Sequence, residues 1–175
     1  MKRYALTASG PYKPGDIVSL SKVLFKNGCS IGDMKTGMLE GVFTATLVFS
    51  APEDKSYLKK IKEFGKASGL KISLKEIPEK PFRHLVCANH IITVAGANKA
   101  GLVYKVAAAL FKMGIGIIEL ETKRIEGEKR ELYIMVFEVF SPAPEAKSRA
   151  GLKALGKRLG VRIGIRPIEA FGPIA

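Results

Sequence analysis

The stretches Gly10-Pro-Tyr-Lys-Pro-Gly15 and Leu24-Phe-Lys-Asn-Gly28 decide the fold, because both recur 86 residues later in the chain. Their counterparts are Gly96-Ala-Asn-Lys-Ala-Gly101 and Leu110-Phe-Lys-Met-Gly114. A further matched pair, Phe64–Ile72 and Leu155–Ile163, lies 91 residues apart, so the second copy has about five additional residues near Glu128–Leu132. The chain is therefore a tandem repeat of two units of roughly 80 residues each. Units of this size commonly need a partner to cover exposed apolar surface, and a second copy supplies one.

Each copy begins with a strand, a glycine turn and a helix. The alternating strands Tyr4–Ala8 and Ile91–Ala95 stop before the first glycine of the turn, and a helix follows the second glycine. The apolar stripes expected to be buried are Ile17, Leu20 and Leu24 in the first helix and Val103, Val106, Ala107, Leu110 and Phe111 in its counterpart. Gly28 and Gly114 stand where a left-handed cap ends a helix.

The remainder of each copy predicts two strands, a helix and a last strand. The strand pairs are Ile31–Leu39 with Val42–Ser50, and Ile115–Glu126 with Glu131–Ser141. Helices open at Pro52-Glu-Asp54 and at Pro142-Ala-Pro-Glu145, and the closing strands are Lys71–Ile77 and Arg162–Ile168. This order is the split βαβ arrangement of ferredoxin-like folds. The sequence thus predicts an α+β protein with two βαββαβ units, at residues 1–78 and 90–175, joined by a linker at residues 79–89.

Composition and charge narrow the class of protein. With 47% apolar and 26% charged residues, the chain has the composition of a soluble globular protein. We expect it in the cytoplasm, because no apolar run approaches the ~20 residues of a membrane span and the N-terminus lacks a signal-peptide core. The net charge of +13 is divided evenly, with +6 in residues 1–77 and +6 in residues 90–175. Either nucleic-acid binding or the ion-pair-rich surface of a thermophile explains such a charge.

The sequence contains no recognisable catalytic or metal-binding pattern. His84 and His90 accompany no cysteine or carboxylate at ligand spacing, and no nucleophile elbow, P-loop or dinucleotide fingerprint occurs. Asp16 is better explained as a charge at a helix N-terminus than as an acid or base. Cys29 and Cys87 lack metal or redox spacing, and both are expected to be buried. We therefore expect a non-enzymatic protein without a cofactor or metal.

The turn between the first strand and the first helix is the best candidate for a binding site. Its glycines allow a sharp bend and leave room for a ligand to approach the backbone. The unpaired amides at the helix start favour a carboxylate or another anion. A tight structural turn is the simpler explanation of one glycine pair, and recurrence of the turn in both copies shifts the balance only modestly toward a ligand.

Three motifs of the first copy resemble the signature of ACT domains, the amino-acid-sensing modules of many metabolic enzymes and regulators. They are Lys13-Pro-Gly-Asp-Ile-Val18, Leu24-Phe-Lys-Asn-Gly-Cys-Ser-Ile31 and Gly41-Val-Phe43. The resemblance covers nearly the whole chain as two ACT units. A tandem without an attached catalytic domain is similar to the glycine cleavage system transcriptional repressor and related stand-alone ACT regulators.

The resemblance implies a small ligand, usually an amino acid, held where ACT units meet by the strand-to-helix turn and the start of the second strand. The implied binding residues are Gly10, Pro14, Gly15, Asp16 and Ser30 in the first copy and Gly96, Asn98, Gly101, Leu102 and Gly116 in the second. Many relatives have an acidic residue before the turn and an asparagine at the second-strand start. This chain has Tyr12 and Asn98 at the first place and Ser30 and Gly116 at the second, so one copy could serve only to build the interface.

The expected function is regulatory: ligand binding shifts an equilibrium between domain or subunit arrangements. A homodimer would cover exposed faces of the small units, and any control of transcription would act through a protein partner, since no helix-turn-helix is evident. The rival function is RNA binding, because the RNA-recognition motif shares this element order. Glu40–Leu47 and Arg130–Phe137 lack most of the aromatic platform of that motif, so direct nucleic-acid binding is not expected. A ligand-free interaction scaffold is the other alternative.

Overall fold

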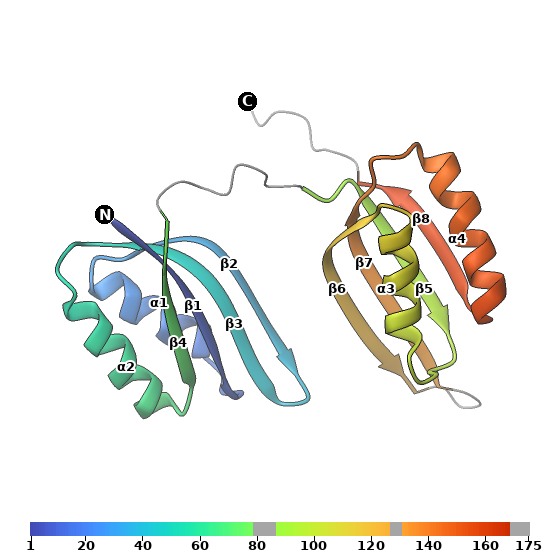
Figure 1. The fold of residues 1–175 in the computed structure, drawn as a ribbon. Helices are drawn as coiled ribbons and strands as arrows, with labels where there is room; N and C mark the ends of the chain where they lie inside the picture. Colours follow the sequence, from blue (N-terminus) through green and yellow to red (C-terminus); the bar gives the residue numbers. More distant parts are fainter. Residues whose placement is uncertain (79–86, 127–130, 169–175) are drawn as a thin grey trace. The chain divides into compact units, whose positions relative to one another are not determined.

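The computed structural model describes residues 1–78, 87–126 and 131–168. The chain divides into two compact units, Met1–Arg83 and His84–Ala175. Unit 1 contains β1 (Lys2–Pro11), α1 (Asp16–Lys26), β2 (Ser30–Leu39), β3 (Val42–Ala51), α2 (Ser56–Ser68) and β4 (Lys71–Ile77). Unit 2 contains β5 (His90–Gly96), α3 (Leu102–Lys112), β6 (Gly116–Ile125), β7 (Leu132–Phe140), α4 (Glu145–Leu159) and β8 (Arg162–Pro167). Figure 1 shows the same element order in both units, which confirms the predicted βαββαβ repeat.

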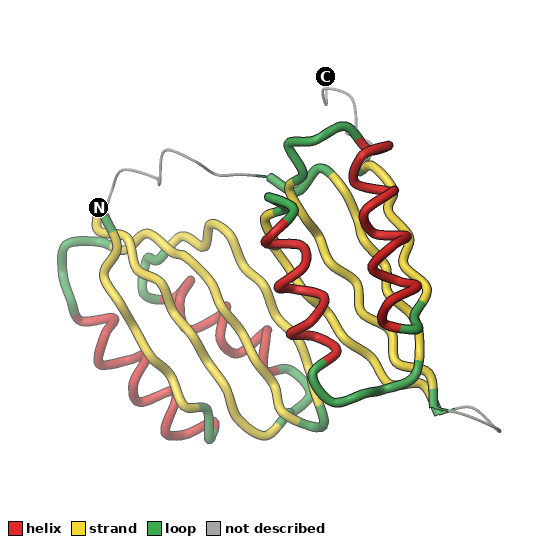
Figure 2. The backbone as a smooth tube through the Cα atoms, turned by 45° about the vertical axis from the view of Figure 1, so that its right-hand side comes forward, coloured by secondary structure: helices red, strands yellow, loops and turns green. Residues whose placement is uncertain are grey.

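Each unit is built on a four-stranded antiparallel sheet. The strand order is β2-β3-β1-β4 in unit 1 and β6-β7-β5-β8 in unit 2. The two helices of a unit cover one face of its sheet (Figure 2). Strand alternation explains this layering, because Phe43, Ala45 and Leu47 of β3 are buried toward the helices, whereas Thr44 and Thr46 are exposed on the open face. The predicted ferredoxin-like α+β class is confirmed.

Each unit has its own apolar core between helices and sheet. In unit 1, Leu20 and Leu24 of α1 and Ile61 of α2 pack over Leu6 and Phe49 of the sheet. The core of unit 2 contains the corresponding groups Val106, Leu110, Leu152, Ile92 and Val139. The buried residues of each cluster come from one unit alone, so each unit has the core of an independent domain.

Several element boundaries differ from the sequence prediction. β1 continues to Pro11 and β5 to Gly96, so Gly10 lies within a strand, paired with Phe43, rather than in the turn after it. α2 begins at Ser56 instead of near Pro52. The reason is local, because the Asp54 carboxylate accepts hydrogen bonds from the Ser56 amide at 3.1 Å and from its hydroxyl at 2.8 Å. α4 begins at Glu145, the last residue of the predicted opening segment Pro142–Glu145.

Three burial predictions are wrong. Ile17 and Phe111 are 47% and 83% exposed, because a three-turn helix on a sheet buries only a narrow i, i+4 stripe and both residues lie beside it. Cys87 is exposed because it precedes β5, outside the sheet, whereas Cys29 is buried as predicted. The predicted left-handed helix ends are confirmed, with φ values of 68° at Gly28 and 72° at Gly114.

Candidate functional site

The turn between β1 and α1 is held by two reciprocal hydrogen bonds. The Lys13 amide donates to Asp16 Oδ2 at 2.7 Å, and the Asp16 amide donates to the Lys13 carbonyl oxygen at 3.1 Å. Asp16 is buried and lies in the first turn of α1, where a negative charge stabilises a helix. The carboxylate therefore shapes the turn itself. The corresponding residue of unit 2, Leu102, is also buried but belongs to the apolar core.

Gly15 and Gly101 expose their backbone at the helix starts. Their φ values of 91° and 77° lie in the left-handed region that favours glycine. A Cβ added at Gly15 would meet no atom within 4 Å, and one at Gly101 would meet only Lys105 Cε, at 3.9 Å. The neighbouring Pro14 and Asn98 are exposed as well. These turns therefore provide the open backbone that a ligand would require.

Gly10 and Gly96 have a different role. A Cβ at Gly10 would lie 2.7 Å from the Gly69 carbonyl oxygen, and one at Gly96 would lie 2.6 Å from Val161 Cγ1. In both units the first strand thus packs closely on the junction between the last helix and the last strand. Close internal packing explains the absence of a side chain at these two positions.

Two lysines that sequence reasoning overlooked extend from the turns to the ends of the last helices. Lys13 Nζ donates to the Ser68 carbonyl oxygen at 2.6 Å, at the C-terminus of α2, where a helix favours positive charge. Its counterpart Lys99 places Nζ 3.5 Å from the position that a Cβ of Gly160 would take, at the C-terminus of α4. The signal was present in the repeat, because the same residue type stands at the same place in both copies.

Within one unit, the structure separates the two parts of the predicted site. Ser30 pairs with Ser50 at one end of the sheet, whereas Gly10 pairs with Phe43, seven β3 residues away. That separation corresponds to roughly 23 Å along a strand. In unit 2, Gly116 pairs with Phe140, seven residues along β7 from the partner of Gly96, Tyr133. The ten predicted residues thus form two turn groups and two isolated strand starts.

In the described ranges 1–78, 87–126 and 131–168, no three His, Cys, Asp or Glu residues lie close enough together to bind a metal ion. His90 Nδ1 lies 2.8 Å from Asn89 Oδ1, and Asn89 in turn pairs with the backbone of Ser141. His90 is thus part of a structural hydrogen-bond group, while His84 lies outside the described residues. No helix in the described ranges has the length and apolar character needed to cross a bilayer.

Comparisons with known proteins agree with this architecture. Residues 4–75 match the ACT domain family. An unknown protein from Galdieria sulphuraria is similar over 96% of this chain and 99% of its own, with 20% identity and a TM-score of 0.78. A candidate glycine cleavage system transcriptional repressor is similar over 97% of this chain and 98% of its own, with 21% identity and a TM-score of 0.71. These TM-scores and coverages show a shared fold over nearly the full chain. No curated protein matches significantly in sequence.

Proposed function

We propose that the chain, whose residues 4–75 match the ACT domain family and whose two units share the ferredoxin-like fold, is a non-enzymatic ACT-domain regulator that binds an amino acid at its strand-to-helix turns. The observation that carries this proposal is the open backbone of Gly15 and Gly101 at the two helix starts. Binding would shift an equilibrium between arrangements of the protein, as in other ligand-controlled regulators.

The two turns differ in the charge that they offer a ligand. The first turn of α1 contains Asp16, whereas the first turn of α3 contains no acidic residue. Unpaired amides at a helix start attract anions, and a nearby carboxylate weakens that attraction. The turn around Gly101 is therefore the better place for the carboxylate of an amino acid. At the turn around Gly15, the backbone of the protein would contact an uncharged part of the ligand rather than its carboxylate.

The open sheet faces favour this function over recognition of RNA bases. Thr7, Thr44 and Thr46 lie on the open face of unit 1, and Ile134 and Val136 lie on that of unit 2. Among the described strands, a single aromatic residue, Phe140, lies on an open face. An RNA-recognition motif stacks bases on several aromatic side chains there. The structure of these faces thus agrees with the sequence-based argument against that motif.

A homodimer is part of the proposal. Phe25 of α1 and Phe111 of α3 occupy equivalent positions and are 80% and 83% exposed. Exposed aromatic side chains at repeated positions are typical of interaction surfaces. Light scattering should give twice the 19.0 kDa of one chain, and the double variant Phe25→Ser/Phe111→Ser should give the monomer mass. Any control of transcription would act through a protein that recognises one assembly state.

Thermal-shift measurements with the twenty amino acids test the proposal. A ligand bound only by the folded state raises the melting temperature by mass action, so one amino acid should do so selectively. Titration calorimetry then compares Gly101→Ala with Gly114→Ala, and Gly15→Ala with Gly28→Ala. Each control glycine also has positive φ but lies at the opposite end of the same helix.

The turn variants should weaken binding, whereas the controls should retain it. Ser30→Ala should have a smaller effect, because Ser30 lies far from the turn of its own unit. Equal losses in a turn variant and its control would remove the turns from the site. A complete absence of thermal shift would favour the interaction scaffold instead.

A further inference from the structure

The positive charge of the chain is concentrated on the last helix and last strand of each unit. Residues 56–77 contain six lysines and two glutamates, and residues 145–168 contain seven Lys and Arg and one glutamate. These two segments therefore hold +10 of the net charge of +13 in about a quarter of the chain. Comparing the net charge of the two halves of the sequence does not reveal this concentration, because each half contains one such segment.

Four basic positions recur at equivalent places in the two units. They are Lys62, Lys66, Lys71 and Lys75 in unit 1 and Lys153, Lys157, Arg162 and Arg166 in unit 2. All eight side chains are exposed. We name each set of four a basic edge, because it borders β4 or β8, the strand at the end of the sheet.

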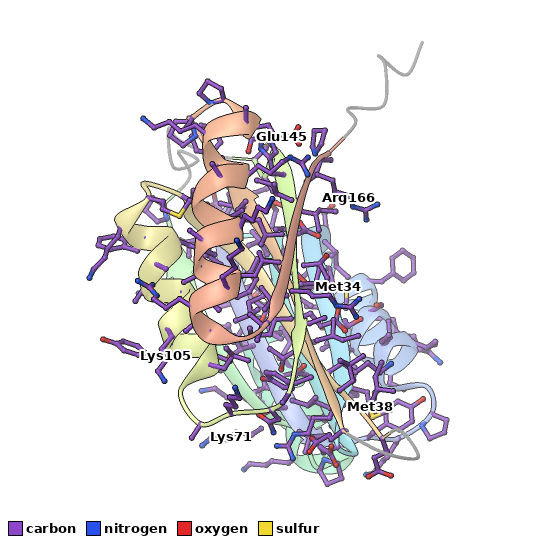
Figure 3. All side chains as sticks on the ribbon, turned by 90° about the vertical axis from the view of Figure 1, so that its right-hand side faces the viewer. Met34, Met38, Lys71, Lys105, Glu145 and Arg166 are labelled. Atoms are coloured by element: carbon purple, nitrogen blue, oxygen red, sulfur yellow. The ribbon has the colours of Figure 1, made fainter. Side chains whose placement is uncertain are left out.

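The residues of each basic edge lie on both sides of the end strand, β4 or β8. Lys62 and Lys66, one helical turn apart on α2, line a shallow hollow of about 330 Å³ beside Leu70 and Ile72. The equivalent hollow in unit 2 measures about 730 Å³ and is lined by Lys153, Lys157, Arg162, Gly96 and Val161, among others. The remaining basic residues lie on the open side of the sheet, because they alternate with side chains that face the core. Figure 3 shows Arg166 projecting from β8 away from α4.

The acidic residues of these segments pair with other cations. Glu63 lies 4.0 and 3.5 Å from Lys59 and Lys60, and Glu76 lies 3.0 Å from Lys2, whose hydrogen bond lowers the pKa of the Glu76 carboxyl. Glu145 pairs with Arg149. Within the described residues, no carboxylate forms an ion pair with a basic edge. The eight positive groups are therefore available to an external anion.

Most of the exposed large apolar side chains lie on other elements of each unit, although Ile168 directly follows β8. The exposed large apolar side chains of the described residues include Phe25, Phe111, Met38 and Ile118, but none belongs to α2, β4, α4 or β8. Protein partners are usually anchored by aromatic and other large apolar side chains, which the basic edges do not offer. Phosphate groups of a nucleic acid need positive charge alone. The composition of the basic edges thus favours a nucleic acid over an acidic protein.

Protection of edge strands is a simpler explanation for part of this pattern. Lysine and arginine on an end strand prevent unwanted strand pairing between molecules. That requirement explains Lys71, Lys75, Arg162 and Arg166, which lie on β4 and β8. It does not explain the four lysines on α2 and α4, which recur at the same spacing in both units.

We propose that the two basic edges bind the phosphodiester backbone of a nucleic acid without reading its sequence. This surface differs from the base-stacking platform of an RNA-recognition motif, since it requires no aromatic side chains. The basic edges lie beside the turns, because Lys13 reaches the Ser68 carbonyl oxygen and Gly96 lines the hollow of unit 2. They include neither Gly15 nor Gly101, so the variants that test amino-acid binding leave all eight basic residues unchanged. Where one polymer engages both edges, the covalent link between the units raises the overall affinity above that of a single edge.

Fluorescence anisotropy with a labelled, mixed-sequence single-stranded RNA of about 20 nucleotides tests the proposal on the full chain. Salt is varied between about 50 and 200 mM, and a DNA duplex of mixed sequence serves as the second probe. The test variant is Lys66→Gln/Lys153→Gln/Lys157→Gln. The control, Lys22→Gln/Lys26→Gln/Lys112→Gln, removes the same charge from exposed positions of α1 and α3. Circular dichroism confirms that both variants fold.

The test variant should lose at least about tenfold in affinity, and its salt slope should fall by about 2, since each contact contributes about 0.7 for a single strand. The control should lose clearly less. Equal losses in both variants, or no binding at the lowest salt, would overturn the proposal. Competition by poly-glutamate as effective as that by RNA of the same charge would assign the edges to an acidic protein and also overturn it. Binding of both RNA and duplex DNA would show that the shared backbone is the ligand.

Discussion

Tyr57 lies in the core of unit 1, and its hydroxyl has no hydrogen-bond partner among the described residues. Its ring packs edge-on against Tyr4 and Phe49, with centroids 5.7 and 6.3 Å apart, and burial raises the pKa of the hydroxyl. An unsatisfied buried hydroxyl costs free energy, so Tyr57→Phe should raise the free energy of unfolding by about 1 kcal/mol in urea titrations. At the equivalent position, the Ser148 hydroxyl lies 3.1 Å from Ser141 Oγ, so Ser148→Ala should lower it. A loss of stability in Tyr57→Phe would show that the hydroxyl is satisfied.

Gly10 is a second residue whose effect depends on a single close approach. An added Cβ would lie 2.7 Å from the Gly69 carbonyl oxygen, so Gly10→Ala should cost about 1–3 kcal/mol through overpacking. Gly37, in the same sheet, is the control, because its added Cβ would meet the nearest atom at an ordinary 3.7 Å. Urea unfolding compares the two variants. Similar costs at both positions would argue against the close approach at Gly10.

At the scale of elements, the hairpin between β2 and β3 carries a strained residue. Glu40 and Gly41 have φ values of 49° and 77°, the signature of a type I′ turn, in which asparagine is favoured at the first position. Glu40→Asn should therefore raise the free energy of unfolding by about 0.5–1 kcal/mol, measured by thermal or urea unfolding. Glu53→Asn, at an exposed loop position without positive φ, removes the same charge and should have little effect. An equal gain in both variants would attribute the effect to charge.

The elements also show where sequence patterns succeed and fail. The order of strands and helices was predictable, because alternation, apolar stripes and glycine caps are local signals. The exposure of Phe111 could not be predicted from these patterns, because it depends on which side of α3 packs against the sheet. The start of α2 differs from the prediction for another reason, since hydrogen bonds from Ser56 to the Asp54 carboxylate outweigh the preference of proline for a first helical turn.

At the scale of the whole molecule, the two separate cores predict that a destabilising substitution in one core leaves the stability of the other unit unchanged. Leu24 and Leu110 are equivalent, fully buried residues of α1 and α3. Each Leu→Ala substitution should destabilise its own unit by about 2–5 kcal/mol through lost contacts and a cavity. Hydrogen exchange read by mass spectrometry should show faster exchange in the altered unit and unchanged exchange in the other. Faster exchange throughout the chain would mean that the units unfold together.

The sequence by itself determined the tandem repeat, the element order, the left-handed glycines and the ACT-like character of the chain, because these features depend on residues close together along the chain. Only the tertiary structure decided the distribution of the candidate sites. It placed Ser30 at the far end of the sheet from Gly10, because strand register sets distance between residues that sequence spacing does not. It also brought the lysines of α2 and those of β4 to the two sides of one end strand, where they form a basic edge. Sequence periodicity predicts the exposed face of a helix and that of a strand separately, and only their packing shows that the two faces are neighbours.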